Sequence, residues 1–153
     1  MQFLELKIPP LVLLFALGLV ALLFASPLVQ GEEVELFSDQ AFLSVAVVSF
    51  LIGSYVALAG VLEFKRHQTT VDPIHPESAS QIVVSGIYSK TRNPMYVGFV
   101  LILAGWCLAL GVMQALWVLP VYVLYLTKLQ IEPEERILLD KYGESFKIGR
   151  AHV

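Results

Sequence analysis

The sequence contains little charge and almost no cysteine. Only 15% of its 153 residues are Asp, Glu, Lys or Arg, whereas a soluble domain carries roughly 25%, so the chain has too few charges to cover a water-facing surface. Its one cysteine excludes a disulfide scaffold. Its net charge of −3 gives nucleic acid no basic face to bind. Because 57% of the residues are hydrophobic, the composition predicts a single-domain integral membrane protein.

Three long runs without a charged residue account for most of the chain. They cover residues 8–29, 40–62 and 93–127, and a helix needs roughly 20 apolar residues to cross a bilayer. The third run has 35 residues and would form a helix of roughly 50 Å, far longer than a bilayer requires. Two short helices with a turn around residues 111–114 fit better. The sequence therefore predicts an all-α membrane bundle with four membrane helices, at about 8–29, 40–62, 95–110 and 114–129.

The charged residues between these runs predict the orientation. Segment 30–39 holds four acidic residues and no basic residue, whereas most of the basic residues lie in 63–94 and after residue 127. Because Lys and Arg are enriched in cytoplasmic segments, we expect both termini and segment 63–94 to face the cytoplasm. The first run could instead be a signal peptide cleaved near Ala25, but it is long for that role.

A tail helix is predicted after the hairpin. It begins at Glu132, because Pro133 suits a first helical turn, and Glu134 and Glu135 suit the positive N-terminal end of the helix dipole.

Polar residues gather directly before and directly after the third apolar run. A hairpin brings its two ends together, so Arg92 and Asn93 would lie across from Glu134 and Glu135. A guanidinium facing two carboxylates suits a zwitterionic ligand, because arginine binds carboxylates in bidentate fashion and carboxylates bind ammonium groups or hydroxyls. Taken singly, each residue also has a purely structural interpretation, as an interface anchor or a helix-start acid.

Other reactive side chains give no comparable signal. His67 and His75 have no partners at metal-ligand spacing, so no metal site is expected. Cys107 lies in an apolar helix, where a thiol is hard to ionise, so we expect it to be inert.

Four motifs, in their order and spacing, resemble the isoprenylcysteine carboxyl methyltransferase family and the related phospholipid methyltransferases. The resemblance covers about residues 60–146. The motifs are Thr69-Thr70-Val71-Asp72-Pro73, Ser85-Gly86-Ile87-Tyr88, Arg92-Asn93-Pro94-Met95-Tyr96-Val97-Gly98 and Glu134-Glu135-Arg136.

The resemblance implies an S-adenosylmethionine-dependent methyltransferase of the bacterial cytoplasmic membrane, whose lipophilic substrate enters from the bilayer. A carboxylate acceptor such as isoprenylcysteine needs no general base, which weakly favours it over an amine or a thiol. The matching motifs imply the following roles. The cofactor pocket would be lined by Gly86, Ile87 and Tyr88, and its polar wall would be formed by Arg92, Asn93 and Tyr96. The cofactor's polar groups would be bound by Glu134 and Glu135, and Gln130 would lie near the active site.

Two features depart from the family pattern. Asn93 stands where the family often has histidine, and asparagine cannot titrate near neutral pH. The final segment 147–153 lacks the family's usual tyrosine and basic-tryptophan ending. One codon choice for this heptapeptide reproduces a common sequencing adapter, so our hypothesis is that the native reading ends near Phe146. No role is assigned to Arg150 or His152.

Two alternative functions remain. Sterol-reductase-like membrane enzymes, which bind a nicotinamide cofactor, also carry an Asn-Pro-x-Tyr-x-Gly box, but they follow it with an Arg-Asp segment and have more membrane helices. The Glu134-Glu135 pair and the short chain favour the methyltransferase. The other alternative is a catalytically silent membrane protein that retains the scaffold, and cofactor binding would separate it from an enzyme.

Overall fold

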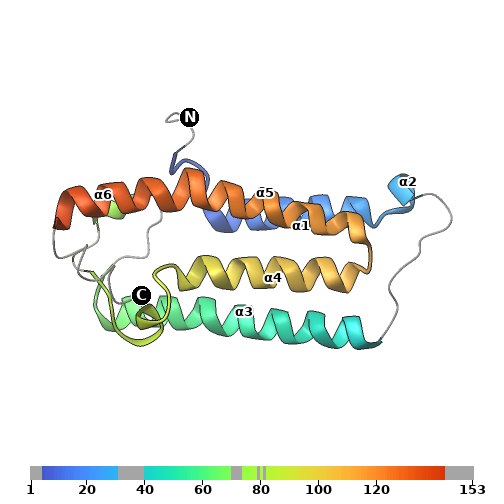
Figure 1. The fold of residues 1–153 in the computed structure, drawn as a ribbon, viewed down its shortest axis with the longest axis horizontal. Coiled ribbons are helices and arrows are strands. Elements are labelled where there is room, and N and C mark those ends of the chain that lie inside the picture. Colours follow the sequence, from blue (N-terminus) through green and yellow to red (C-terminus); the bar gives the residue numbers. More distant parts are fainter. Residues whose placement is uncertain (1–4, 31–39, 70–73, 79, 81, 144–153) are drawn as a thin grey trace.

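The computed structural model describes residues 5–30, 40–69, 74–78, 80 and 82–143 (Figure 1). All regular elements within these residues are helical, which confirms the predicted all-α class. Three predicted features lie outside the described residues: the acidic segment 31–39, motif residues 70–73 and the tail 144–153. The helices are α1 (Pro10–Phe24), α2 (Pro27–Gln30), α3 (Gln40–Arg66), η2 (Pro76–Ser78), η3 (Gly86–Ser89), α4 (Pro94–Leu110), η4 (Met113–Trp117), α5 (Val118–Tyr125), η5 (Leu126–Ile131) and α6 (Glu132–Tyr142).

Helix α4 lies in the middle of the bundle (Figure 1). Helix α3 runs along one side of α4, and α1 and α5 run along the other side. Helix α6 extends the line of α5 beyond η5 and ends at the end of the molecule that also holds η2. The bundle therefore places the start of α4 and the start of α6 near the same end.

Small residues bring α3 and α4 into backbone contact. A Cβ atom added to Gly98 would lie 2.6 Å from the carbonyl oxygen of Gly53 and 2.7 Å from the backbone nitrogen of Ala57. Helices in apolar surroundings associate through such close packing because water provides no driving force between them. One side-chain hydrogen bond adds to this contact, from Ser49 Oγ to the Leu101 carbonyl at 2.9 Å.

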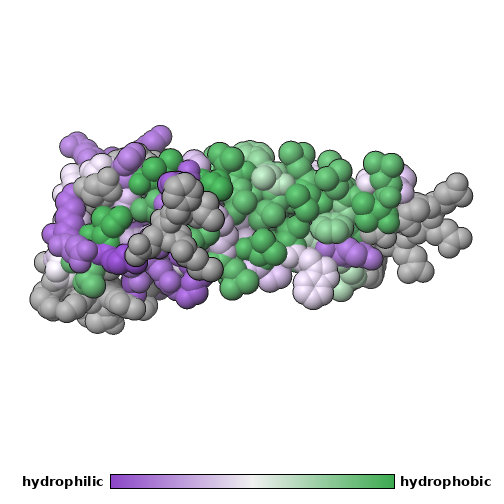
Figure 2. All heavy atoms as spheres, turned by 90° about the horizontal axis from the view of Figure 1, so that it is seen from above, coloured by the Kyte–Doolittle hydropathy of each residue, from purple (hydrophilic) through white to green (hydrophobic). Residues whose placement is uncertain are grey.

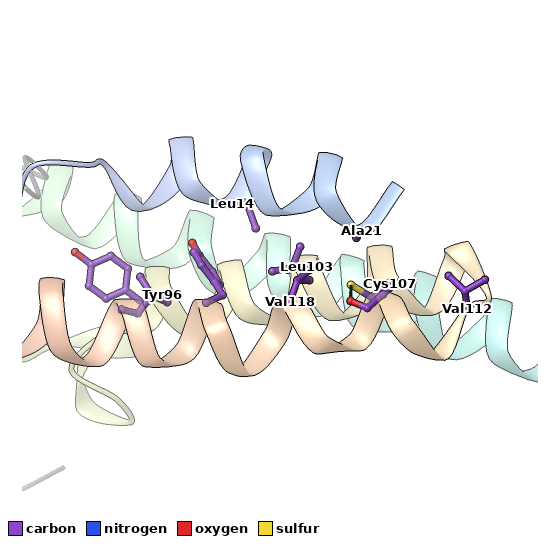
Figure 3. Close-up of a cluster of buried hydrophobic side chains, with 10 residues drawn as sticks. Leu14, Ala21, Tyr96, Leu103, Cys107, Val112 and Val118 are labelled. Atoms are coloured by element: carbon purple, nitrogen blue, oxygen red, sulfur yellow. Dashed lines mark hydrogen bonds between the residues drawn. The ribbon is translucent and has the colours of Figure 1, made fainter. Parts of the chain in front are cut away.

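A second contact surface joins α4 to α1, η4 and α5 (Figure 3). Its buried residues include Leu14, Leu103 and Val118. Cys107 is buried there as predicted, and its thiol donates to the Ala115 carbonyl at 3.3 Å. This core fixes α5 against α4 and thereby sets the position of the residues that follow α5.

The predicted hairpin turn is confirmed. Helix α4 ends at Leu110, and Gly111 adopts a left-handed conformation with φ 71°, which glycine adopts without steric cost. The second arm was predicted as one helix over 114–129, but it consists of η4, α5 and the π-helix η5. The α-helical part begins at Val118, so Pro120 lies in the first turn, where its missing N–H costs no hydrogen bond.

One described helix, α3, is long and apolar enough to span a membrane. It begins at residue 40 as predicted and continues to Arg66. The predicted span 8–29 is interrupted, because α1 ends at Phe24 and Pro27, which has no N–H, starts a separate helix. Helices α1 and α4 are apolar but shorter, with 15 and 17 residues, so the four-span arrangement stays a prediction.

Hydrophobic and hydrophilic residues are segregated along the length of the molecule. Figure 2 shows hydrophobic residues over its middle and hydrophilic residues gathered at the end that holds α6. Large apolar side chains are exposed along the helices, among them Leu43 and Leu58 of α3 and Val121 of α5. A soluble monomer rarely exposes so much contiguous apolar surface, so this surface indicates association with a membrane.

Candidate functional site

The candidate site lies at the hydrophilic end of the bundle, where four segments meet. The loop before α4, the first turn of α4, η5 and the first turn of α6 each contribute polar side chains. The sequence predicted that the segments before and after the hairpin meet, because a hairpin returns the chain to its starting side, and the hydrogen bonds between them confirm that prediction.

Arg92 and Glu135 form an ion pair across the mouth of the hairpin. Arg92 Nη1 donates to Glu135 Oε1 at 2.5 Å, and the two side chains are 25% and 31% exposed. Arg92 is fixed near this position because it stands two residues before Pro94, the first residue of α4. The pair presents a fork of donors and a carboxylate, both partly accessible, to any ligand at this end.

Next to this pair, Glu134 accepts two hydrogen bonds from buried groups. The Tyr96 hydroxyl donates to Glu134 Oε1, and Gln130 Nε2 donates to the same oxygen at 2.6 Å. Gln130 is fully buried and Tyr96 is nearly so. Figure 3 shows Tyr96 at one end of the buried cluster, with its hydroxyl directed away from the core.

Burial gives Glu134 unusual proton affinity. Loss of hydration raises the pKa of the Glu134 carboxyl to about 7, an effect that the Gln130 and Tyr96 hydrogen bonds partly oppose and the charge of Glu135 adds to. Glu134 therefore changes its charge near neutral pH. A cationic ligand beside Glu134 would favour its ionised form.

A π-helix positions Gln130 and Glu134. Segment η5 carries Gln130, and Glu134 follows four residues later. The wider π turn lies beside Pro133. In an α-helix the N–H of residue 133 would donate to the Leu129 carbonyl, but proline has no N–H. The Leu6 backbone N–H supplies that hydrogen bond instead, at 3.0 Å. A residue far away in sequence thus completes the helix next to the site.

Two further contacts hold the N-terminal segment against this helix. Arg136 of α6 forms an ion pair with Glu5, and the Tyr125 hydroxyl donates to the Ile8 carbonyl at 3.0 Å. This role of residues 5–8 was not predicted from the sequence. No local pattern signals it, since the segment acts through backbone groups and one acid.

The loop that the resemblance assigns to a cofactor pocket forms η3. Gly86 has φ +58°, a conformation that other residues rarely adopt, and Ile87 is half-buried. Tyr88 is buried with its ring edge-on against Phe64, at a centroid distance of 5.0 Å.

The Tyr88 hydroxyl is buried and has no hydrogen-bond partner among the described residues. Burial raises its pKa, and the negative charges of Glu134 and Glu63 act in the same direction. Because buried polar groups are nearly always paired, this hydroxyl is available to a ligand.

Asn93 takes part less directly than expected. Its backbone N–H donates to Thr91 Oγ1 at 3.3 Å and its carbonyl accepts from Val97. No hydrogen bond from its side chain to Glu134 or Glu135 is found in the described part of the chain. Asn93 therefore precedes the first turn of α4 and contributes backbone hydrogen bonds there. Its role in the polar wall of a cofactor pocket stays a prediction.

One acid was not recognised as part of this region from the sequence. Glu63, near the end of α3, is buried and accepts a hydrogen bond from Ser85. In the sequence it stands among Lys65, Arg66 and His67 and resembles an ordinary polar helix end. Its partner lies 22 residues away, so only the tertiary structure reveals it.

The sequence model of the phospholipid methyltransferase family matches residues 41–145, a longer stretch than the 60–146 expected from the motifs. No curated protein and no solved structure matches the chain significantly. The matched segment covers more than half of the chain and contains every predicted site residue, so this protein belongs to the phospholipid methyltransferase family.

Proposed function

We propose that this protein transfers a methyl group from S-adenosylmethionine to a lipophilic acceptor at the cytoplasmic face of a membrane. The observation that carries the proposal is the double contact across the hairpin, in which Arg92 pairs with Glu135 and the Tyr96 hydroxyl donates to Glu134. Gln130 supports this contact from the same arm as Glu134. Arg92, Tyr96, Glu134 and Glu135 come from the two motifs, 92–98 and 134–136, whose combination is typical of the family.

The residues present fit the polar groups of this cofactor. Arg92 offers donors to an amino-acid carboxylate, and Glu134 and Glu135 offer acceptors to an ammonium group or to ribose hydroxyls. The buried Tyr88 hydroxyl adds a donor that no described residue uses.

The bound cofactor supplies an electrophilic methyl group on a sulfonium sulfur. The protein's task is then to align the acceptor with that methyl group and to exclude water. Tyr96 and Gln130 serve that task because they are buried and hold Glu134 by hydrogen bonds from two different helical segments. When the acceptor is a carboxylate, it carries no proton that must be removed, so the reaction needs positioning and no general base.

The acceptor is proposed to reach this site from the bilayer. The apolar middle surface lies directly beside the hydrophilic end (Figure 2), so a lipid with a polar head could keep its chain in the membrane while its head meets the site. We also propose the four-span arrangement with both termini cytoplasmic. The basic residues of segment 63–94 lie at the hydrophilic end, and basic residues are enriched on the cytoplasmic side of a membrane. Two acceptor classes are proposed for testing: a phospholipid amine, suggested by the family's name, and an isoprenylcysteine carboxylate.

A methyl-transfer assay tests the proposal. The full chain, purified in detergent, is incubated with S-adenosylmethionine labelled on the methyl group and with either phosphatidylethanolamine or a farnesylated N-acetylcysteine. We expect label in the extracted lipid for one of them, and a loss of about tenfold or more in the rate for Glu134→Gln, because a hydrogen bond to a charged group contributes about 1.5–3 kcal/mol.

Glu132→Gln is the matched control. Glu132 lies on the same helix but is half-exposed, and its partner is Lys128 at 2.5 Å, so this change should leave the rate unaltered. Loss of activity in both variants would assign the effect to α6 as a whole. Binding of a nicotinamide cofactor in place of S-adenosylmethionine would favour the reductase alternative, and binding of neither by folded protein would favour a silent scaffold.

A further inference from the structure

A second polar cluster lies at the end of α3, outside the pairs already described. Its centre is Glu63, a charged residue near the end of the apolar helix α3 that is only 7% exposed. A buried carboxylate is costly unless it is paired and hydrogen-bonded. Its partners therefore indicate what keeps it there.

Three side chains contact the Glu63 carboxylate. Ser85 Oγ donates to Oε1 at 2.5 Å, Arg66 Nη1 donates to Oε2 at 3.3 Å, and His67 Nε2 lies 3.6 Å from Oε1. His67 Nε2 is also 2.7 Å from Ser85 Oγ. Arg66 and His67 belong to the same helix end as Glu63, so Ser85 is the contact that joins α3 to the loop before α4.

Glu63 also packs directly against the backbone of that loop. A Cβ atom added to Gly86 would lie 2.7 Å from both Cδ and Oε2 of Glu63. Gly86 combines this close approach with φ +58°, so a side chain is disfavoured twice at this position. Glu63 thus bonds to the residue before the turn and fills the space that a side chain at the turn would need.

The turn held by Glu63 determines where Tyr88 stands. Gly86 is the first residue of η3, and the Tyr88 N–H donates to the Ser85 carbonyl at 3.0 Å. The Tyr88 ring packs on Phe64, the residue that follows Glu63 in α3. One turn of α3 therefore positions Tyr88 in two ways: Glu63 holds the backbone turn before Tyr88, and Phe64 packs against its ring.

We propose that Glu63 is a positioning residue for the ligand site: together with Ser85 it locks the backbone turn at Gly86 and so holds the Tyr88 hydroxyl where a ligand can bind it. Glu63 acts through Ser85 and Gly86 and does not itself touch the ligand. This inference rests on the proposed function, because the ligand used to test it is the product of the cofactor.

Calorimetric titration of S-adenosylhomocysteine into the detergent-purified full chain tests the inference, because it reports the Kd and the number of sites per chain separately. We expect Glu63→Ala and Ser85→Ala to raise the Kd about tenfold, the equivalent of about 1.4 kcal/mol, with the number of sites unchanged. Ser85→Thr keeps the hydroxyl and should restore the wild-type Kd. Glu63→Gln keeps an oxygen acceptor and should have a smaller effect than Glu63→Ala.

The other outcomes are distinguishable. A merely structural role would lower the number of sites and leave the Kd unchanged, which overturns the inference. An unchanged Kd in Ser85→Ala overturns it too, and this variant decides the question if Glu63→Ala does not fold. Glu132→Gln is the control and should match the wild type. Failure of the wild-type protein to bind would reject the proposed function instead.

Discussion

Along the α3–α4 interface the two backbones touch, and the geometry is set by the absence of side chains at Gly53 and Gly98. At the hydrophilic end, the loop before α4 and the first turn of α6 meet instead through the long charged side chains of Arg92 and Glu135. The first region tolerates almost no added volume, whereas the side chains of the second are partly exposed, which the proposed ligand requires. The bundle therefore separates the residues that fix the fold from those proposed to bind.

The largest expected effect is on the packed region. Gly98→Ala places a Cβ atom 2.6 Å from the Gly53 carbonyl oxygen, and backbone cannot move aside easily, so we expect a loss of about 3 kcal/mol in the free energy of unfolding. Gly18→Ala is the matched control in α1, where a new Cβ atom would meet Trp106 at 3.8 Å, an ordinary contact. There alanine should stabilise by roughly 0.5–1 kcal/mol.

Thermal unfolding of both variants in detergent, followed by circular dichroism, measures this difference. Equal melting temperatures for the two variants would contradict the claim that backbone contact sets the α3–α4 geometry.

The hydrophilic end should respond in the opposite way, with binding lost and folding kept. Glu134→Ala and Glu135→Ala should each weaken S-adenosylhomocysteine binding about tenfold or more, since each removes a charged acceptor. The melting temperature should change little in Glu135→Ala, because the Glu135 side chain is partly exposed. In Glu134→Ala it should fall, though less than in Gly98→Ala, because the buried Tyr96 and Gln130 side chains lose an acceptor. Fluorescence or calorimetric binding together with a melting curve gives both values, and unchanged affinity in both variants would remove these acids from the site.

A pH series sharpens the difference between the two neighbouring glutamates. The pKa of Glu134 is raised from 4.5 to about 7, so the folded protein binds more protons than the unfolded chain between these values, and the ligand-free protein should lose stability as the pH rises through this range. Ligand affinity should rise instead, by up to about tenfold between pH 6 and pH 8, because the ionised carboxylate binds a cationic group.

Glu134→Gln should flatten both pH profiles. A Glu135→Gln variant that flattens them as well would show that the titrating group had been assigned to the wrong residue.

The smallest expected effect concerns the ion pair that ties the N-terminal segment to α6. Arg136 is 55% exposed in its pair with Glu5, and exposed pairs contribute only about 0–1 kcal/mol. Arg136→Ala should therefore lower the melting temperature slightly, with the backbone bond from Leu6 to Leu129 still in place. A drop as large as that of Gly98→Ala would show that this segment holds the bundle together.

Much of the fold was predictable because it follows from length and charge. A charge-free run too long for one helix required a turn, and Gly111 provides it. The return of the hairpin then required Arg92 to approach the acids after it, which the ion pair with Glu135 confirms. The break of the first span before Pro27 could also have been predicted, since proline has no N–H to continue a helix.

Other features depend on partners that local sequence does not reveal. The π-helix η5 is accompanied by a hydrogen bond from Leu6, more than a hundred residues away in sequence. The role of Glu63 depends on Ser85 and on the conformation of Gly86. Each of these is a contact between distant segments, where pattern and propensity give no information.

We propose above all that the hydrophilic end of this bundle binds S-adenosylmethionine. Titration of S-adenosylhomocysteine into the folded wild-type chain tests it most directly, with Glu132→Gln and Glu134→Gln measured alongside. We expect saturable binding at one site per chain, equal affinity for Glu132→Gln and affinity about tenfold weaker for Glu134→Gln. Absence of binding by folded wild-type protein, or equal binding by all three proteins, would contradict it.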